Sequence, residues 1–185
     1  NTGSRAAELG VELANSGLDS KTLSTLVKEM EAAGASYEGA EASFQLLVER
    51  HRSTYVAPFT IVDFTVIVEQ REGAPGRAEA TVRVEVAGER LHTAADGNGP
   101  VNALDRALRK ALGAFYPQLD AVHLVDYKVR ILDGATATGA ITRVLLDATN
   151  GDRSWTTIGV SANIIEASWN ALEESLIYGL LHASA

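Results

Sequence analysis

The chain has 185 residues, 46% of them hydrophobic, and a formal net charge of −8 at pH 7. This acidic balance argues against a DNA or RNA partner, because no basic patch offsets phosphate repulsion. No apolar run approaches the roughly 20 residues that span a bilayer and no signal-peptide pattern opens the chain, so we expect a cytoplasmic protein with no membrane partner. The lack of cysteine excludes disulfides and thiolate metal sites.

Residues 1–53 are predicted to form a helical linker subdomain. Three short helices are expected, at 6–13, from a cap at Asp19 or Ser20 up to Gly34, and at about 38–52. The apolar side of the third would comprise Phe44, Leu47, Val48 and His51. Helices this short cannot bury an apolar face alone, so they must pack on the following domain or on another domain. The abrupt opening at Asn1 favours a fragment of a longer chain.

From Tyr55 onward the hydrophobic period changes to two, which indicates strands. The expected strands are 59–68, 78–86, one ending near Ala95, 121–131, 138–148 and 153–160. Helices are expected after the third strand and after the sixth. The first follows the turn Asp96-Gly97-Asn98-Gly99-Pro100 and repeats apolar residues at 101, 104, 108, 112 and 115, and the second covers about 163–181.

The two halves of this region repeat each other at an offset of 63 or 64 residues. The repeat aligns the helix residues Ala103, Ala107, Leu108 and Leu112 with Ala167, Ala171, Leu172 and Leu176. It also aligns residues 61–68 with 124–131, Gly88 with Gly151, and His92-Thr93 with Trp155-Thr156. Such regularity indicates duplication. Residues 54–185 are therefore predicted to form an α+β domain of two pseudo-symmetric βββα units, with two antiparallel three-stranded sheets and two packed helices.

No catalytic constellation emerges from the residues. The histidines, at 51, 92, 123 and 182, lack metal-ligand spacing, and Asp96-Gly97-Asn98-Gly99 departs from a calcium loop at Pro100. The N–H groups at this helix start suit an anion such as a carboxylate, but a plain strand-to-helix turn is the alternative. Asp63 and Asp126 are expected to face outward, and Trp155 and Trp169 to lie in the core. An enzyme acting through His92 or Asp96 is kept as a rival.

Four segments together resemble the carboxy-terminal part of enzymes of the 2-isopropylmalate synthase family, to which the citramalate synthases belong. The segments are Gly39-Ala40-Glu41-Ala42-Ser43-Phe44-Gln45-Leu46-Leu47, Asp96 to Asp105, Asp126-Tyr127-Lys128-Val129-Arg130-Ile131-Leu132-Asp133-Gly134, and Trp155 to Trp169. The resemblance covers nearly the whole chain and is weakest over residues 1–20. Each segment is unspecific by itself, whereas the set is specific.

The resemblance implies a division of labour between this chain and the rest of such an enzyme. Enzymes of this family join a catalytic TIM barrel to a helical linker and then to an allosteric, dimer-forming domain of two βββα units. The barrel condenses acetyl-CoA with a 2-keto acid, which is pyruvate for citramalate synthases, using a divalent metal held by an Asp and a His-x-His motif. None of that machinery occurs in this sequence. We therefore expect a homodimeric regulatory fragment without catalytic residues, metal or cofactor.

The resemblance also implies feedback inhibition by an end-product amino acid, isoleucine for citramalate synthases and leucine for isopropylmalate synthases, bound near the dimer interface. Of these two amino acids, isoleucine is the one we expect as the effector of this chain. The inhibitor-binding positions carried over by motif are Val101, Asn102, Leu124, Tyr127, Ile131, Thr136, Ala140, Ala162 and Ile164. Some relatives carry Tyr-Asp where this chain has Val101-Asn102. A ligand-free structural dimerisation domain is the alternative.

Overall fold

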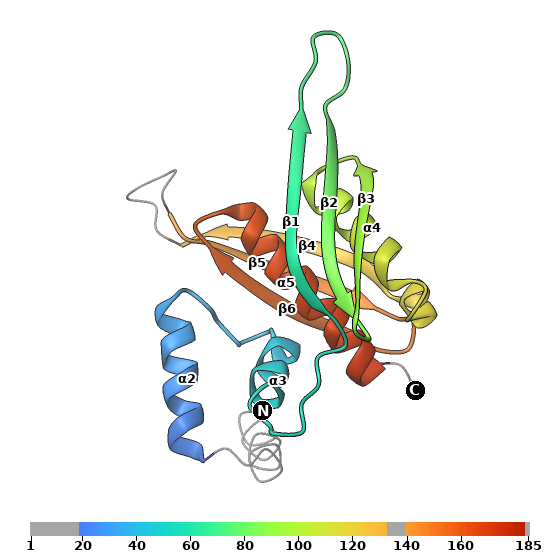
Figure 1. The fold of residues 1–185 in the computed structure, drawn as a ribbon. Coiled ribbons are helices and arrows are strands. Elements are labelled where there is room, and N and C mark those ends of the chain that lie inside the picture. The colour runs from blue at the N-terminus through green and yellow to red at the C-terminus, as the bar shows by residue number, and fades with distance from the viewer. Residues whose placement is uncertain (1–18, 133–139, 184–185) are drawn as a thin grey trace.

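The computed structural model describes residues 19–132 and 140–183 (Figure 1). The elements in order are α2 (Ser20–Ala32), α3 (Glu41–Glu49), β1 (Thr60–Glu69), β2 (Arg77–Val86), β3 (Glu89–Gly97), α4 (Pro100–Leu112), the 3-10 turn η1 (Pro117–Ala121), β4 (His123–Ile131), β5 (Thr142–Thr149), β6 (Ser154–Ser161), α5 (Ile164–Tyr178) and the π-helical turn η3 (Gly179–Ala183).

The strands form two antiparallel three-stranded sheets, in the order β1-β2-β3 and β4-β5-β6. Helix α4 packs on the first sheet, α5 packs on the second, and the two helices contact each other (Figure 1). This arrangement confirms the predicted α+β fold of two βββα units. Among the described residues, one cluster of buried apolar side chains runs through both units, so the two units share a core.

Equivalent details recur in the two units. The ladder of the first strand shifts register between Ile61 and Asp63 in β1, and between Leu124 and Asp126 in β4, which are 63 residues further on. On the third strands, Thr93 Oγ1 donates to the Ala107 carbonyl and Thr157 Oγ1 to the Ala171 carbonyl, each at 2.7 Å and 64 residues apart. The duplication predicted from the sequence therefore extends to individual backbone irregularities and hydrogen bonds.

One correspondence predicted from the sequence is wrong by a residue. Thr93 answers Thr157, not Thr156, because it pairs with Val82 as Thr157 pairs with Leu146. In the preceding turn of the first unit both Ala87 (φ 51°) and Gly88 (φ 80°) are left-handed, and it is Ala87 that corresponds to the left-handed Gly151 (φ 95°) of the second unit. Matching Gly88 to Gly151 by residue type therefore shifted the alignment.

The helices of both units pack closely on their sheets. Both bury a stripe of small residues, Ala103, Ala107 and Ala111 in α4 and Ala167, Ala171 and Ser175 in α5. A Cβ built on Gly159 of β6 would lie 1.9 Å from the Ala167 carbonyl oxygen. The approach of α5 to β6 is therefore possible only with glycine at this position.

Strand β1 of the first unit also crosses α5 of the second unit (Figure 1). The Phe64 ring stacks on the Trp169 ring, with 4.6 Å between centroids and 30° between planes. Trp155 lies under the other end of α5, where Nε1 donates to the Ser175 carbonyl at 3.0 Å. Both tryptophans are buried, as predicted.

The linker helices are partly as predicted. Asp19 caps α2, accepting from the Thr22 backbone N–H at 2.6 Å, whereas the expected helix at 6–13 lies outside the described residues. The predicted apolar side of α3 is only partly right: Val48 is buried, but Phe44 and Leu47 are half-buried and His51 is exposed. Leu46, which the prediction left out, is fully buried. Helix α3 packs on β6 and α5, so the following domain covers its apolar residues.

Candidate functional site

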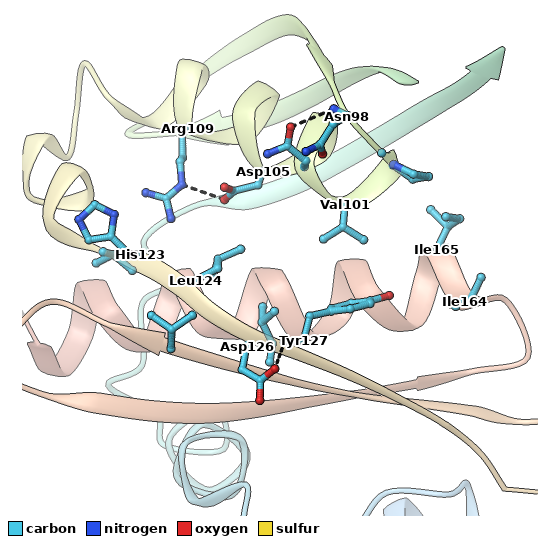
Figure 2. Close-up of a pocket in the computed structure, with 16 residues that line it drawn as sticks. Asn98, Val101, Asp105, Arg109, His123, Leu124, Asp126, Tyr127, Ile164 and Ile165 are labelled. Carbon is cyan, nitrogen blue, oxygen red and sulfur yellow. Dashed lines mark hydrogen bonds and ion pairs between the residues drawn. The ribbon is translucent and has the colours of Figure 1, made fainter. Parts of the chain in front are cut away.

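A pocket of about 990 Å³ lies where β4 passes the first turns of α4 and α5 (Figure 2). It is lined by Asn98, Gly99, Pro100, Val101, Asn102, Asp105, Arg109, Val122, His123, Leu124, Val125, Asp126, Tyr127, Leu146, Ile164 and Ile165. The pocket thus combines residues of both βββα units and depends on the way they interlock.

Apolar side chains and one phenol form most of the visible wall. Val101 points down from α4 and Leu124 points up from β4, while Ile164 and Ile165 close the end at the start of α5 (Figure 2). The Tyr127 ring lies along the pocket and its hydroxyl is 2.6 Å from Ser168 Oγ. Because Ser168 Oγ donates to the Ile164 carbonyl at 2.7 Å, Tyr127 is the donor of this bond.

An ion pair forms the charged part of the wall. Val101, Asp105 and Arg109 follow one another at four-residue spacing along one face of α4. Arg109 Nε lies 2.8 Å from Asp105 Oδ1, and Arg109 Nη1 donates to the Leu119 carbonyl at 2.8 Å. The two side chains are only 24% and 15% exposed, against 47% and 52% for the surface pair Arg83–Asp63. The pair is therefore fixed and shielded from solvent.

The start of α4 makes the contacts of a strand-to-helix turn. Pro100 occupies the first helical turn, where it contributes no N–H, and the cap residue Gly99 offers no side chain. The Asn102 carboxamide oxygen accepts from the Asn98 backbone N–H at 3.2 Å. Asn102 therefore uses its side-chain acceptor to fix the turn.

Five of the residues carried over by resemblance line this pocket: Val101, Asn102, Leu124, Tyr127 and Ile164. Others lie elsewhere: Ile131 is 59% exposed near the end of β4, Ala162 is exposed before α5, and Ala140 is buried before β5. Thr136 lies outside the described residues. Sequence reasoning missed Asp105 and Arg109, although their four-residue spacing from Val101 would have indicated a shared helix face.

A second polar cluster joins the linker to α5. The half-buried Glu174 accepts hydrogen bonds from Ser43 Oγ and from Arg50 Nη1, the latter at 2.9 Å, and Ser43 Oγ itself accepts from the Ile158 N–H at 2.8 Å. Burial raises the pKa of the Glu174 carboxyl, which the Arg50 guanidinium partly offsets. Burial also raises the pKa of Tyr37, with Glu174 adding to the effect, to about 12. This cluster holds α3, α5 and β6 together.

The described residues give little support to other kinds of site. Within 19–132 and 140–183, no group of three or more His, Asp or Glu side chains could hold a metal ion. His92 is exposed, so the buried histidine that an enzyme acting through it would need is missing. Asp63 and Asp126 are exposed as predicted and pair with Arg83 and Lys128, although Asp126 also borders the pocket. None of the described helices is long and apolar enough to cross a bilayer.

Comparison with known proteins identifies a matching family and several relatives by sequence. The sequence model of the LeuA allosteric (dimerisation) domain matches residues 38–180. An (R)-citramalate synthase of Aquifex aeolicus is 46% identical over 175 residues, covering 94% of this chain and 33% of the relative. One from Geobacter sulfurreducens is 49% identical over 169 residues, covering 88% and 32%. A 2-isopropylmalate synthase of a Shewanella species is 33% identical over 108 residues, covering 57% and 19%. The chain thus spans about a third of the length of the citramalate synthases it matches.

Proposed function

The chain belongs to the LeuA allosteric (dimerisation) domain family, and on this premise we propose that it is the regulatory part of an acyltransferase of the citramalate synthase or 2-isopropylmalate synthase type. In such an enzyme the condensation of acetyl-CoA with a 2-keto acid, and the divalent metal it uses, belong to a catalytic barrel. The residues of this chain would bind an effector and a second subunit, with no catalytic role.

The effector we propose is a branched-chain amino acid, isoleucine in preference to leucine. The observation that carries this proposal is a pocket in which an apolar wall meets a fixed ion pair. Val101, Leu124 and Ile164 offer an aliphatic side chain an apolar surface, and Asp105 with Arg109 supplies both signs of charge for a zwitterion. A pocket with only one of these features would suit a hydrocarbon or an ion better.

We further propose that a second copy of the chain packs on β4 beside this pocket. Tyr127, Val129 and Ile131 alternate along one face of β4 and are 41%, 41% and 59% exposed. Ile164, at the pocket's end, is 45% exposed. An exposed apolar row on an edge strand marks a surface that a partner buries. Because the family is one of dimerisation domains, the partner we propose is a second copy of the chain. A subunit placed here would also reduce the opening of the pocket.

Helix α5 is the natural route from the pocket to the linker. Ile164 and Ile165 line the pocket at its first turn, and Trp169 stacks on Phe64. Further along α5, Glu174 accepts hydrogen bonds from Ser43 of α3 and from Arg50, the residue that follows α3. A displacement of the first turn of α5 moves the rest of this rigid helix. A ligand in the pocket can therefore change how the linker packs on the other end of α5. Coupling of this kind is typically about 1–3 kcal/mol and requires two states that the ligand binds unequally.

Calorimetric titration with L-isoleucine, L-leucine and L-valine, with sedimentation of the free and bound protein, tests the proposal. We expect saturable binding of one amino acid at micromolar to millimolar affinity, with about one site per chain of a dimer. A folded dimer that gives no heat with any of the three would exclude effector binding by this chain and favour the structural dimerisation alternative.

Glu173 gives a pH-dependent prediction at the linker side of α5. Burial raises the pKa of its carboxyl, and the Arg50 guanidinium only partly offsets this. A raised folded-state pKa means that stability is greatest below the unfolded value, about 4.3, and falls as pH rises through the folded value. We expect Glu173→Gln to match the parent at pH 4 and to be more stable at pH 7.5.

Urea unfolding at several pH values measures this difference in the free energy of unfolding. Glu72→Gln, an exposed carboxylate in the turn after β1, is the matched control and should show no such trend. A Glu173→Gln variant that loses relative stability as pH rises would contradict the prediction.

A further inference from the structure

The pocket occupies one of two pseudo-equivalent crossings in the chain. In the first, β1 crosses α5 and Phe64 stacks on Trp169. The equivalent of Phe64 in β4 is Tyr127, because both pair with equivalent residues of the next strand, Val82 and Leu146. The equivalent of Trp169 in α4 is Asp105, because Ala107 answers Ala171.

The two crossings differ in the helix residue that lies beneath the strand. At the β1 crossing, the large indole of Trp169 fills the space beneath the strand and is itself buried. At the β4 crossing, the short carboxylate of Asp105 takes its place and leaves the pocket open beside Tyr127. The position where an indole in one unit corresponds to a short carboxylate in the other is thus also the position where an ionic group faces the pocket.

Both members of the ion pair keep unused hydrogen-bonding capacity toward the pocket. Asp105 engages Arg109 through Oδ1, and among the contacts of the described residues its Oδ2 has no partner. Arg109 donates through Nε and Nη1, and on the same basis its Nη2 retains its two N–H groups. A carboxylate acceptor and a guanidinium donor therefore remain side by side, held in place by their mutual bond and by the Leu119 carbonyl.

We propose that Asp105 binds the ammonium group of the effector and Arg109 its carboxylate, with one such site per chain. This inference rests on the proposed function, since it assigns the polar contacts of the same pocket. The two charges of an α-amino acid are adjacent, as are the two members of the pair, so one ligand can reach both. The aliphatic side chain then lies toward Val101, Leu124 and Ile164. Charge-assisted bonds in so shielded a place give strong discrimination against ligands lacking either charge.

Titration of single-charge variants tests this assignment. Asp105→Asn keeps the shape of the side chain and removes its charge, and Arg109→Gln removes the guanidinium. Each should weaken binding of the amino acid about tenfold or more, the scale of a lost charge-assisted hydrogen bond. Asp63→Asn and Arg83→Gln are the matched controls, because each removes one charge of the exposed ion pair that joins β1 to β2. Both variants should bind the amino acid as the parent does.

Analogues that carry one charge provide a second readout. The amino acid's deaminated counterpart, a branched-chain fatty acid, should lose affinity with Arg109→Gln but not with Asp105→Asn. Circular dichroism and thermal melting establish that each variant is folded; if Arg109→Gln is not, Asp105→Asn and the analogue decide alone. Parent-like affinity of a folded Asp105→Asn protein would overturn the assignment while leaving the proposed function standing. Failure of the parent itself to bind any amino acid would overturn the proposed function.

Discussion

Gly159→Ala is expected to lower the free energy of unfolding by about 3 kcal/mol or more, a large fraction of the roughly 5–15 kcal/mol by which folded domains are stable. The added Cβ would lie 1.9 Å from the Ala167 carbonyl oxygen and 2.9 Å from the Ala171 backbone nitrogen. Both are backbone atoms of α5, so no side-chain rotation relieves the clash. The helix would have to move away from β6, which would break the Thr157–Ala171 hydrogen bond and open the core.

Urea unfolding followed by circular dichroism measures this loss. Gly99→Ala is the matched control, because a Cβ there meets nothing within 4 Å and the backbone φ of −167° is open to any residue. We expect it to change stability by less than about 1 kcal/mol, the scale of a helix-cap preference. Equal stability of the two variants would mean that α5 does not pack on β6 as closely as described.

Much of the fold could be predicted because the strands and helices of this chain carry clean periodic patterns. Alternation in β2, where Ala80, Val82 and Val84 are buried, identifies the strand and its inner face. The repeat of small residues in α4 and α5 reveals the duplication, and an acidic residue before an apolar run locates the start of α2. These features depend on local sequence, so a single chain is enough to recognise them.

The errors arise where local sequence is ambiguous. The turn before β3 places Ala87 in a backbone conformation usually taken by glycine, so aligning by glycine misplaced one strand by a residue. In α3 the face that is buried is chosen by β6 and α5, which bury Leu46 and accommodate Ser43 through its bond to Ile158. When both faces of a helix carry apolar and polar residues, their spacing in the sequence does not show which face a distant element will bury.

The candidate site was predictable only in part, for a related reason. Resemblance located the helix start and β4, which bring Val101 and Tyr127 to the pocket. It did not indicate Asp105 and Arg109, since an ion pair at four-residue spacing is also common on solvated helix faces. Only the crossing of β4 over α4 makes that face an interior wall. The exposed position of Ile131 likewise depends on what covers β4 outside a single chain.

Ile131→Asp is expected to weaken dimerisation about a hundredfold or more without unfolding the chain. If a second copy covers β4, the substitution buries an unpaired carboxylate in an apolar interface, a penalty of several kcal/mol. In the monomer the side chain is 59% exposed, so the change should alter the free energy of unfolding by no more than about 0.5 kcal/mol. Effector affinity should fall as well, because the second subunit also narrows the pocket.

Sedimentation at several protein concentrations measures the dimer dissociation constant. Arg130→Asp is the matched control, since it introduces the same side chain on the same strand but on the opposite face, where Arg130 is exposed. A parent dimer that Arg130→Asp dissociates and Ile131→Asp leaves intact would put the interface on the outer face of the sheet. Dissociation by Ile131→Asp alone, together with weaker amino-acid binding, would tie the pocket to the dimer, because only a subunit seated on the inner face of β4 reaches both.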